Sequence, residues 1–168
     1  LAHTQHKTIH QTNQTEQEDY ADDINETVVM ISIADNMLFN TASYRLSSKA
    51  DPILKKLADV INSEPSLDVM VEGHTDARTI STDFLADNWD LSVMRATSVV
   101  RKLQEKYNVA PEKLIAAGRS SYQPIAENDS RDNRAKNRRT RIIILPNIDK
   151  FFALMSENSD VAVNNILD

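Results

Sequence analysis

The residues best suited to chemistry follow a short apolar run near the middle of the chain. Residues 67–71 read as a buried strand, and the sequence EGHTD at 72–76 follows it directly. Small and polar side chains at the end of a buried strand mark the usual place of ligand sites on α/β sheets. Arg95 comes nineteen residues after Asp76, on a predicted helix. One carboxylate and one guanidinium therefore flank a polar loop.

Hydrophobic spacing predicts the elements that must position this loop. A capping box at Ser48 to Asp51 is expected to start the first helix, which ends near Ser63 before a proline. Asn88 is a strong candidate for the N-cap of the second helix. The patterns give a strand, a turn and a second extended piece within 28–39, further strands at 67–71, 114–117 and 141–145, and helices at 53–61 and 88–107.

The order of these elements predicts the α/β (α+β) class. Strand, helix, strand, helix, strand, strand is expected to form a two-layer sandwich, with the helices on one face of a mixed sheet. This domain occupies residues 28–146. Residues 1–27 are interpreted as a polar acidic linker, and residues 147–168 as a C-terminal extension that is partly helical.

Composition bears on the class of function. The chain has no cysteine, which excludes a disulfide framework, a thiol nucleophile and a zinc ribbon. It has no run of about 18 apolar residues, so no membrane-spanning helix is expected in this sequence. Residues 1–27 carry one base and six acids, and residues 28–146 carry 17 bases and 15 acids. This near balance argues against nucleic-acid binding, which needs a large positive field.

The chain has only two glycines, Gly73 and Gly118, and each falls at the end of a predicted strand. Glycine at such positions indicates either a close approach of backbones or a positive φ. We expect the two loops to lie on the same edge of the sheet. Ordinary turn chemistry is the alternative.

An enzyme is the competing class of function. His74, Asp76 and three later aspartates lie within seventeen residues, a composition that a metal-dependent hydrolase could use. The later aspartates lie in a loop with no second histidine, and no serine has an evident base. His74 is better explained as a structural hydrogen-bond partner. We therefore expect no catalytic residue, no metal and no cofactor.

Four blocks of sequence carry a family resemblance. VEGHTD at 71–76, NWDLSVMRATSVV at 88–100, IAAGRSSYQPI at 115–125 and NRRTRIII at 137–144 resemble, in this order, the OmpA C-terminal-like domain, the peptidoglycan-binding module also found in MotB. The NWDLS wording is closer to the MotB-type branch. Ser120 departs from the pattern, because family members often carry a second glycine there.

The resemblance implies a ligand and the residues that hold it. The family's ligand is the stem peptide of peptidoglycan, held by the end of its diaminopimelate, which bears an ammonium and a carboxylate on one carbon. Asp76 matches the aspartate that accepts the ammonium, and Arg95 matches the arginine that takes the carboxylate through parallel hydrogen bonds. Both side chains are expected to serve the ligand rather than the core. Supporting contacts are expected from Asn88, Arg138, Thr75 and Asn40.

The resemblance also implies a cellular role, which is to anchor a membrane protein to the cell wall from the periplasm. The anchor is expected in a segment that precedes Leu1, either a lipid attached to the outer membrane or a transmembrane helix in the inner membrane. The first alternative describes an outer-membrane lipoprotein, and the second describes a flagellar-type motor stator. A homodimer is compatible with the MotB-type branch.

Overall fold

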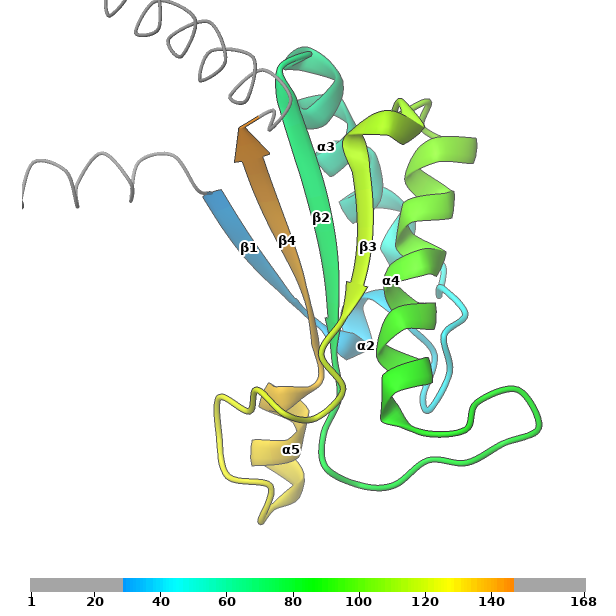
Figure 1. Cartoon of the computed structure of the whole chain (residues 1–168), viewed down its shortest axis with the longest axis vertical. Coiled ribbons are helices and arrows are strands. Elements are labelled where there is room, and N and C mark those ends of the chain that lie inside the picture. The colour runs from blue at the N-terminus through cyan, green and yellow to red at the C-terminus, as the bar shows by residue number, and fades with distance from the viewer. Residues whose placement is uncertain (1–28, 147–168) are drawn as a thin grey trace, which may run out of the picture.

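A computed structural model describes residues 29–146. Four strands form one mixed sheet in the order β1-β4-β2-β3, and the helices α3 and α4 lie beside it (Figure 1). The four predicted strands in their order, the two long helices and the mixed sheet are confirmed, whereas two further short helices were not predicted. The strands are β1 (Val29–Ala34), β2 (Leu67–His74), β3 (Leu114–Gly118) and β4 (Arg139–Pro146); the helices are α2 (Asp35–Leu38), α3 (Ala50–Ser63), α4 (Asn88–Glu105) and α5 (Arg131–Asn137), with a 3₁₀ turn, η1, at Pro111–Lys113.

Strand pairing places two polar loops at one end of the sheet. β2 is parallel to β3 and antiparallel to β4, and β4 is antiparallel to the edge strand β1. The chain leaves β2 after His74 and leaves β3 after Gly118, at the same end of the sheet. β4 begins at that end, directly after α5. Residues from β2, β4 and α5 therefore converge there.

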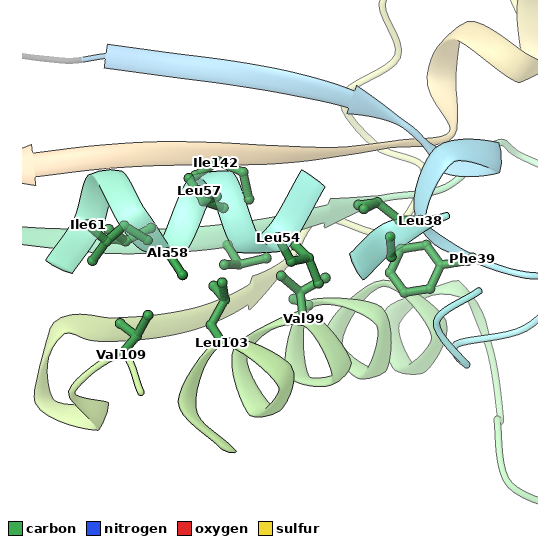
Figure 2. Close-up of a cluster of buried hydrophobic side chains, with 14 residues drawn as sticks. Leu38, Phe39, Leu54, Leu57, Ala58, Ile61, Val99, Leu103, Val109 and Ile142 are labelled. Carbon is green, nitrogen blue, oxygen red and sulfur yellow. The ribbon is translucent and has the colours of Figure 1, made fainter. Parts of the chain in front are cut away.

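The hydrophobic core lies between one face of the sheet and the two long helices. Leu54, Leu57 and Ile61 recur on α3 at helical spacing, and Val99 and Leu103 do so on α4. These side chains belong to one buried cluster, in which Leu57 lies beside Ile142 of β4 (Figure 2). Full burial of one aliphatic side chain contributes about 1.5–3 kcal/mol relative to exposure. The core therefore fixes α4 firmly enough to orient polar groups along its length.

The sequence prediction for residues 28–39 was wrong in its second half. After β1 the chain forms the short helix α2 rather than an extended piece, and it then makes one isolated bridge between Phe39 and Leu46. The reason is tertiary: Leu38, the last residue of α2, and Phe39, the extended residue that follows it, are both buried in the core. This turn also places Asp35 beside the loops described above.

Both predicted helix caps differ in the structure. α3 begins after Lys49 with no side-chain hydrogen bond at its N-cap, so the capping box at Ser48 to Asp51 does not form. The N-cap of α4 is Asp87, whose carboxylate accepts a hydrogen bond from the backbone N–H of Asp90 at 3.1 Å. Asn88 is thus the first residue of the helix rather than its cap, which leaves its amide available for other contacts.

The two glycines allow α4 to pack closely on the sheet. Gly73 and Gly118 are register partners on β2 and β3, and neither has a positive φ. A Cβ at Gly73 would collide with the backbone carbonyl of Ser92, and one at Gly118 would collide with the Ser92 hydroxyl. Close backbone approach is therefore the correct alternative. The left-handed conformation falls instead on Ser120, with a φ of 51°.

The predicted linker at 1–27 and the helical part of 147–168 lie outside the described residues. Among residues 29–146, no helix is both long enough and apolar enough to cross a membrane.

Candidate functional site

A cleft of about 390 Å³ lies at the end of the sheet where β2 ends and α5 meets β4. Its walls come from α2 and the turn that follows it, from the loop after β2, from the first half of α4, and from the junction of α5 with β4. The lining residues are Asp35, Asn36, Phe39, Thr41, Ala42, Thr75, Asp76, Arg78, Thr79, Ile80, Asn88, Leu91, Arg95 and Arg138.

Arg95 is buried in the wall of the cleft. Its side chain is 4% exposed, and its guanidinium stacks 5.1 Å from the centroid of the Phe39 ring. Nε donates a hydrogen bond to the carbonyl of Ser43 at 2.8 Å, and Nη1 lies 2.7 Å from an oxygen of Asp35. Within residues 29–146, Nη2 donates no hydrogen bond to the protein. Nε and Nη1, which lie on different sides of the guanidinium, are thus held by the protein, and Nη2 is left for a guest.

Asp76 lies in the wall formed by the loop after β2 and is also buried, with its side chain 6% exposed. It accepts a hydrogen bond from the backbone N–H of Arg78 at 2.9 Å, which closes a local turn of the kind that aspartate favours. Nη2 of Arg78 donates a hydrogen bond to Oδ2 of Asp76 at 2.8 Å, and Nη1 of Arg138 donates to the same oxygen at 2.7 Å. Two arginines therefore neutralise this carboxylate.

Arg138 joins the two walls. It donates to Asp76, and its Nε lies 3.8 Å from Oδ2 of Asp35, which in turn pairs with Arg95. The five charges consequently alternate along the cleft, in the order Arg78, Asp76, Arg138, Asp35 and Arg95. Three bases and two acids leave one net positive charge on this row.

The pKa values of the two acids move in opposite directions. Burial raises the pKa of Asp35 above its usual range, although the nearby charges of Arg95 and Arg138 oppose that change. Burial would also raise the pKa of Asp76, but hydrogen bonds from Arg78 and Arg138 outweigh it and hold the pKa at about 2. Asp76 is therefore ionised at every physiological pH and can accept hydrogen bonds from a cation.

Five of the six predicted site residues line the cleft. Thr75 and Asn88 join the charged residues there, and Asn88 donates from Nδ2 to the carbonyls of Asp76 at 3.3 Å and Arg78 at 2.9 Å. Thr75 donates its hydroxyl proton to the carbonyl of Asp76 at 2.9 Å. Both therefore brace the loop that carries Asp76. Asn40 is exposed and does not line the cleft, although its neighbours Phe39 and Thr41 do.

Sequence reasoning missed Asp35 and Arg78. Asp35 was read as part of a turn between two extended pieces, and nothing nearby in sequence pairs with it, because its partners are Arg95 and Arg138. The only signal was an aspartate directly after a β-branched strand. Arg78 lies two residues after Asp76, close enough that a local ion pair could have been considered.

His74 belongs to a different network. Its side chain is buried, and its Nε2 lies 2.6 Å from Glu72, which also accepts hydrogen bonds from Arg119 and Arg141. This arrangement gives His74 the structural role expected from the sequence. His74 does not line the cleft, and no group of three or more potential metal ligands occurs within residues 29–146. His74 and Asp76, the pair on which the hydrolase alternative depended, therefore belong to separate hydrogen-bond networks.

Comparison with known proteins places this geometry in a family. The family model described as "OmpA family" matches residues 38–138, which hold most of the cleft. The chain belongs to the OmpA family. It is 30% identical over 118 residues to Motility protein B of Bacillus subtilis, covering 70% of this chain and 45% of that protein. The likeness to MotB-type proteins that the NWDLS block predicted is confirmed.

Solved structures agree in fold. A MotB-like protein from Desulfovibrio vulgaris superposes with a TM-score of 0.67 at 28% identity, covering 72% of this chain and 77% of that one. The cell wall anchor of the type VI secretion system of Pseudomonas aeruginosa superposes with a TM-score of 0.65 at 32% identity, covering 75% and 93%. The chain spans about half the length of the curated relatives it matches. It carries an OmpA-like peptidoglycan-binding domain, a module that is not enzymatic.

Proposed function

We propose that the cleft binds the side-chain end of diaminopimelate in the stem peptide of peptidoglycan. Asp76 accepts hydrogen bonds from the ammonium, and Arg95 donates to the carboxylate on the same carbon. The observation that carries the proposal is that these two buried charges of opposite sign line one cleft. A zwitterion is neutral overall, so it can enter such a site without leaving a buried charge unpaired.

The geometry of Arg95 supports its role. Ser43, Asp35 and the Phe39 ring hold Nε, Nη1 and one face of the guanidinium, so little conformational entropy is lost when a guest carboxylate pairs with Nη2. Asn88 and Thr75 support the Asp76 loop through its backbone carbonyls. Arg138 keeps both acids partly neutralised in the empty cleft and is near enough to contact the peptide.

The affinity for one stem peptide should be modest. A hydrogen bond to a charged group contributes roughly 1.5–3 kcal/mol net. Two or three such bonds with a few neutral contacts correspond to a Kd in the micromolar range. Peptidoglycan presents many copies of the stem peptide, so retention on the wall would come from rebinding and multivalency.

The cellular role follows from the location of the ligand. Peptidoglycan lies outside the cytoplasmic membrane, so the domain would act in the periplasm and anchor a membrane protein to the wall. A tether for an outer-membrane protein and a motor stator anchored in the inner membrane both fit this role. The sequence similarity to Motility protein B favours the stator type. Expression of the full-length protein in a strain without its stator, followed by a motility assay, separates these two.

Co-sedimentation with purified sacculi tests the binding proposal. The domain should be retained on walls with diaminopimelate at the third stem position, and much more weakly on walls with lysine there, which lack the second carboxylate. Asp76→Asn should lose retention, whereas Asp83→Asn, a matched change of an exposed aspartate in the same loop, should not. Equal retention on both kinds of wall would contradict the assignment of Arg95. Full retention of Asp76→Asn would contradict the site.

A further inference from the structure

Arg78 already occupies the position that the guest ammonium requires. Its Nε lies 3.2 and 3.3 Å from the two carboxylate oxygens of Asp76, and its Nη2 lies 2.8 Å from Oδ2. Its backbone N–H and Nη1 of Arg138 complete the set of donors around Asp76. An ionised carboxylate offers about four acceptor sites. The carboxylate is therefore saturated in the empty cleft, and a new donor must displace an existing one.

The two arginines on Asp76 differ in how easily they can leave. The side chain of Arg78 is 63% exposed, and within residues 29–146 all of its side-chain hydrogen bonds go to Asp76. The side chain of Arg138 is 25% exposed and lies between Asp76 and Asp35, so its departure would also weaken a second contact. Rotation of Arg78 into solvent costs little, because its guanidinium is then hydrated.

We propose that Arg78 competes with the ammonium of the guest for Asp76. In the empty cleft Arg78 binds the carboxylate, and on binding the ammonium displaces it. This inference rests on the proposed function. In the empty protein Arg78 neutralises a buried carboxylate, and during binding one cation is exchanged for another. A guest without a positive charge cannot drive this exchange, because Asp76 would be left underpaired in a buried position. Arg78 thus selects for cationic guests and lowers the affinity for the correct one.

Isothermal titration calorimetry with the tripeptide L-Ala-γ-D-Glu-meso-diaminopimelate tests this role on the purified chain. Arg78→Gln removes the competing charge, and the affinity for the tripeptide should increase about two- to fivefold, the factor that corresponds to loss of an exposed ion pair. Arg119→Gln is the matched control. The side chain of Arg119 is likewise exposed, to 51%, and it pairs with the buried carboxylate of Glu72, but Arg119 lies outside the cleft. Its substitution should leave the affinity unchanged.

The outcomes separate this inference from the function on which it rests. If Asp76→Asn abolishes binding and Arg78→Gln strengthens it, both stand. If Asp76→Asn abolishes binding while Arg78→Gln weakens it or leaves it unchanged, the competitor role of Arg78 is overturned and the site remains. If Asp76→Asn binds the tripeptide as the unaltered protein does, the proposed function itself fails.

Discussion

Arg95→Ala should destabilise the fold as well as impair binding, which differs from the sequence-based expectation that Arg95 serves only the ligand. The guanidinium is nearly inaccessible to solvent and contacts three parts of the chain, namely Asp35 on α2, the carbonyl of Ser43 and the ring of Phe39. Its removal leaves Asp35, whose side chain is 14% exposed, without its nearest cation. Arg138 at 3.8 Å compensates only in part.

The magnitude can be worked from these contacts. Removing one member of a buried ion pair costs about 3–5 kcal/mol when no other charge compensates. The partial exposure of Asp35 and the proximity of Arg138 reduce this, while the lost stacking on Phe39 adds about 0.5–1 kcal/mol. We expect a loss of about 2–4 kcal/mol. For a domain of roughly 120 residues this lowers the Tm by about 10 °C or more.

Urea unfolding followed by circular dichroism measures this loss. Arg101→Ala is the matched control, because Arg101 lies on the same helix and is exposed. It should change the free energy of unfolding by less than about 0.5 kcal/mol. An Arg95→Ala variant as stable as the Arg101→Ala variant would refute the reasoning, because the contacts to Asp35, Ser43 and Phe39 would then contribute nothing to the fold.

Three further changes test other parts of the account. Gly73→Ala should destabilise the domain by about 1–3 kcal/mol or more in urea unfolding, because the new methyl group meets the backbone of Ser92 and the backbone cannot rotate away; unchanged stability would argue against the close approach of α4. Ser120→Gly should raise the Tm by a few degrees, because glycine adopts a φ of 51° without the strain of a Cβ, and a lower Tm would show that the hydroxyl contributes more than the strain costs. Acid should destabilise the domain as the pH falls from about 4 toward 2. The pKa of Asp76 in the folded protein, about 2, lies below its value in the unfolded chain, so the stability that this carboxylate contributes is complete above pH 4 and is lost as it protonates. Melting curves of Asp76→Asn at several pH values should lack this part of the pH dependence. An identical pH dependence in Asp76→Asn and the unaltered protein would contradict this role of Asp76.

Local sequence patterns predicted most of the elements, for reasons visible in particular residues. The apolar spacing of Leu54, Leu57 and Ile61 predicted α3, and the apolar run that ends at Val71 predicted β2, because each pattern directs its side chains into the same core. The loops after Gly73 and Gly118 were likewise expected on one edge of the sheet, and the parallel pairing of β2 with β3 places them there, although the register pairing of the two glycines was not predicted.

Features that depend on distant partners escaped prediction. α2 forms because Leu38 and Phe39 enter a core built from α3 and α4, and a four-residue helix has no periodicity to detect. The helix α5 is almost entirely polar, so it has no apolar stripe from which a helix could be predicted. Asp35 gains its importance from Arg95, sixty residues later in the chain. Such contacts are properties of the packed domain, which short-range spacing does not encode.

The central claim is that two opposite charges in one cleft hold a diaminopimelate guest. The most direct measurement is a crystal structure of the domain soaked with the tripeptide L-Ala-γ-D-Glu-meso-diaminopimelate. We expect the ammonium within about 3 Å of the Asp76 carboxylate and the adjacent carboxylate within hydrogen-bond distance of Arg95, as for charge-assisted hydrogen bonds. Clear density for the tripeptide elsewhere on the domain, with this cleft empty, would contradict it.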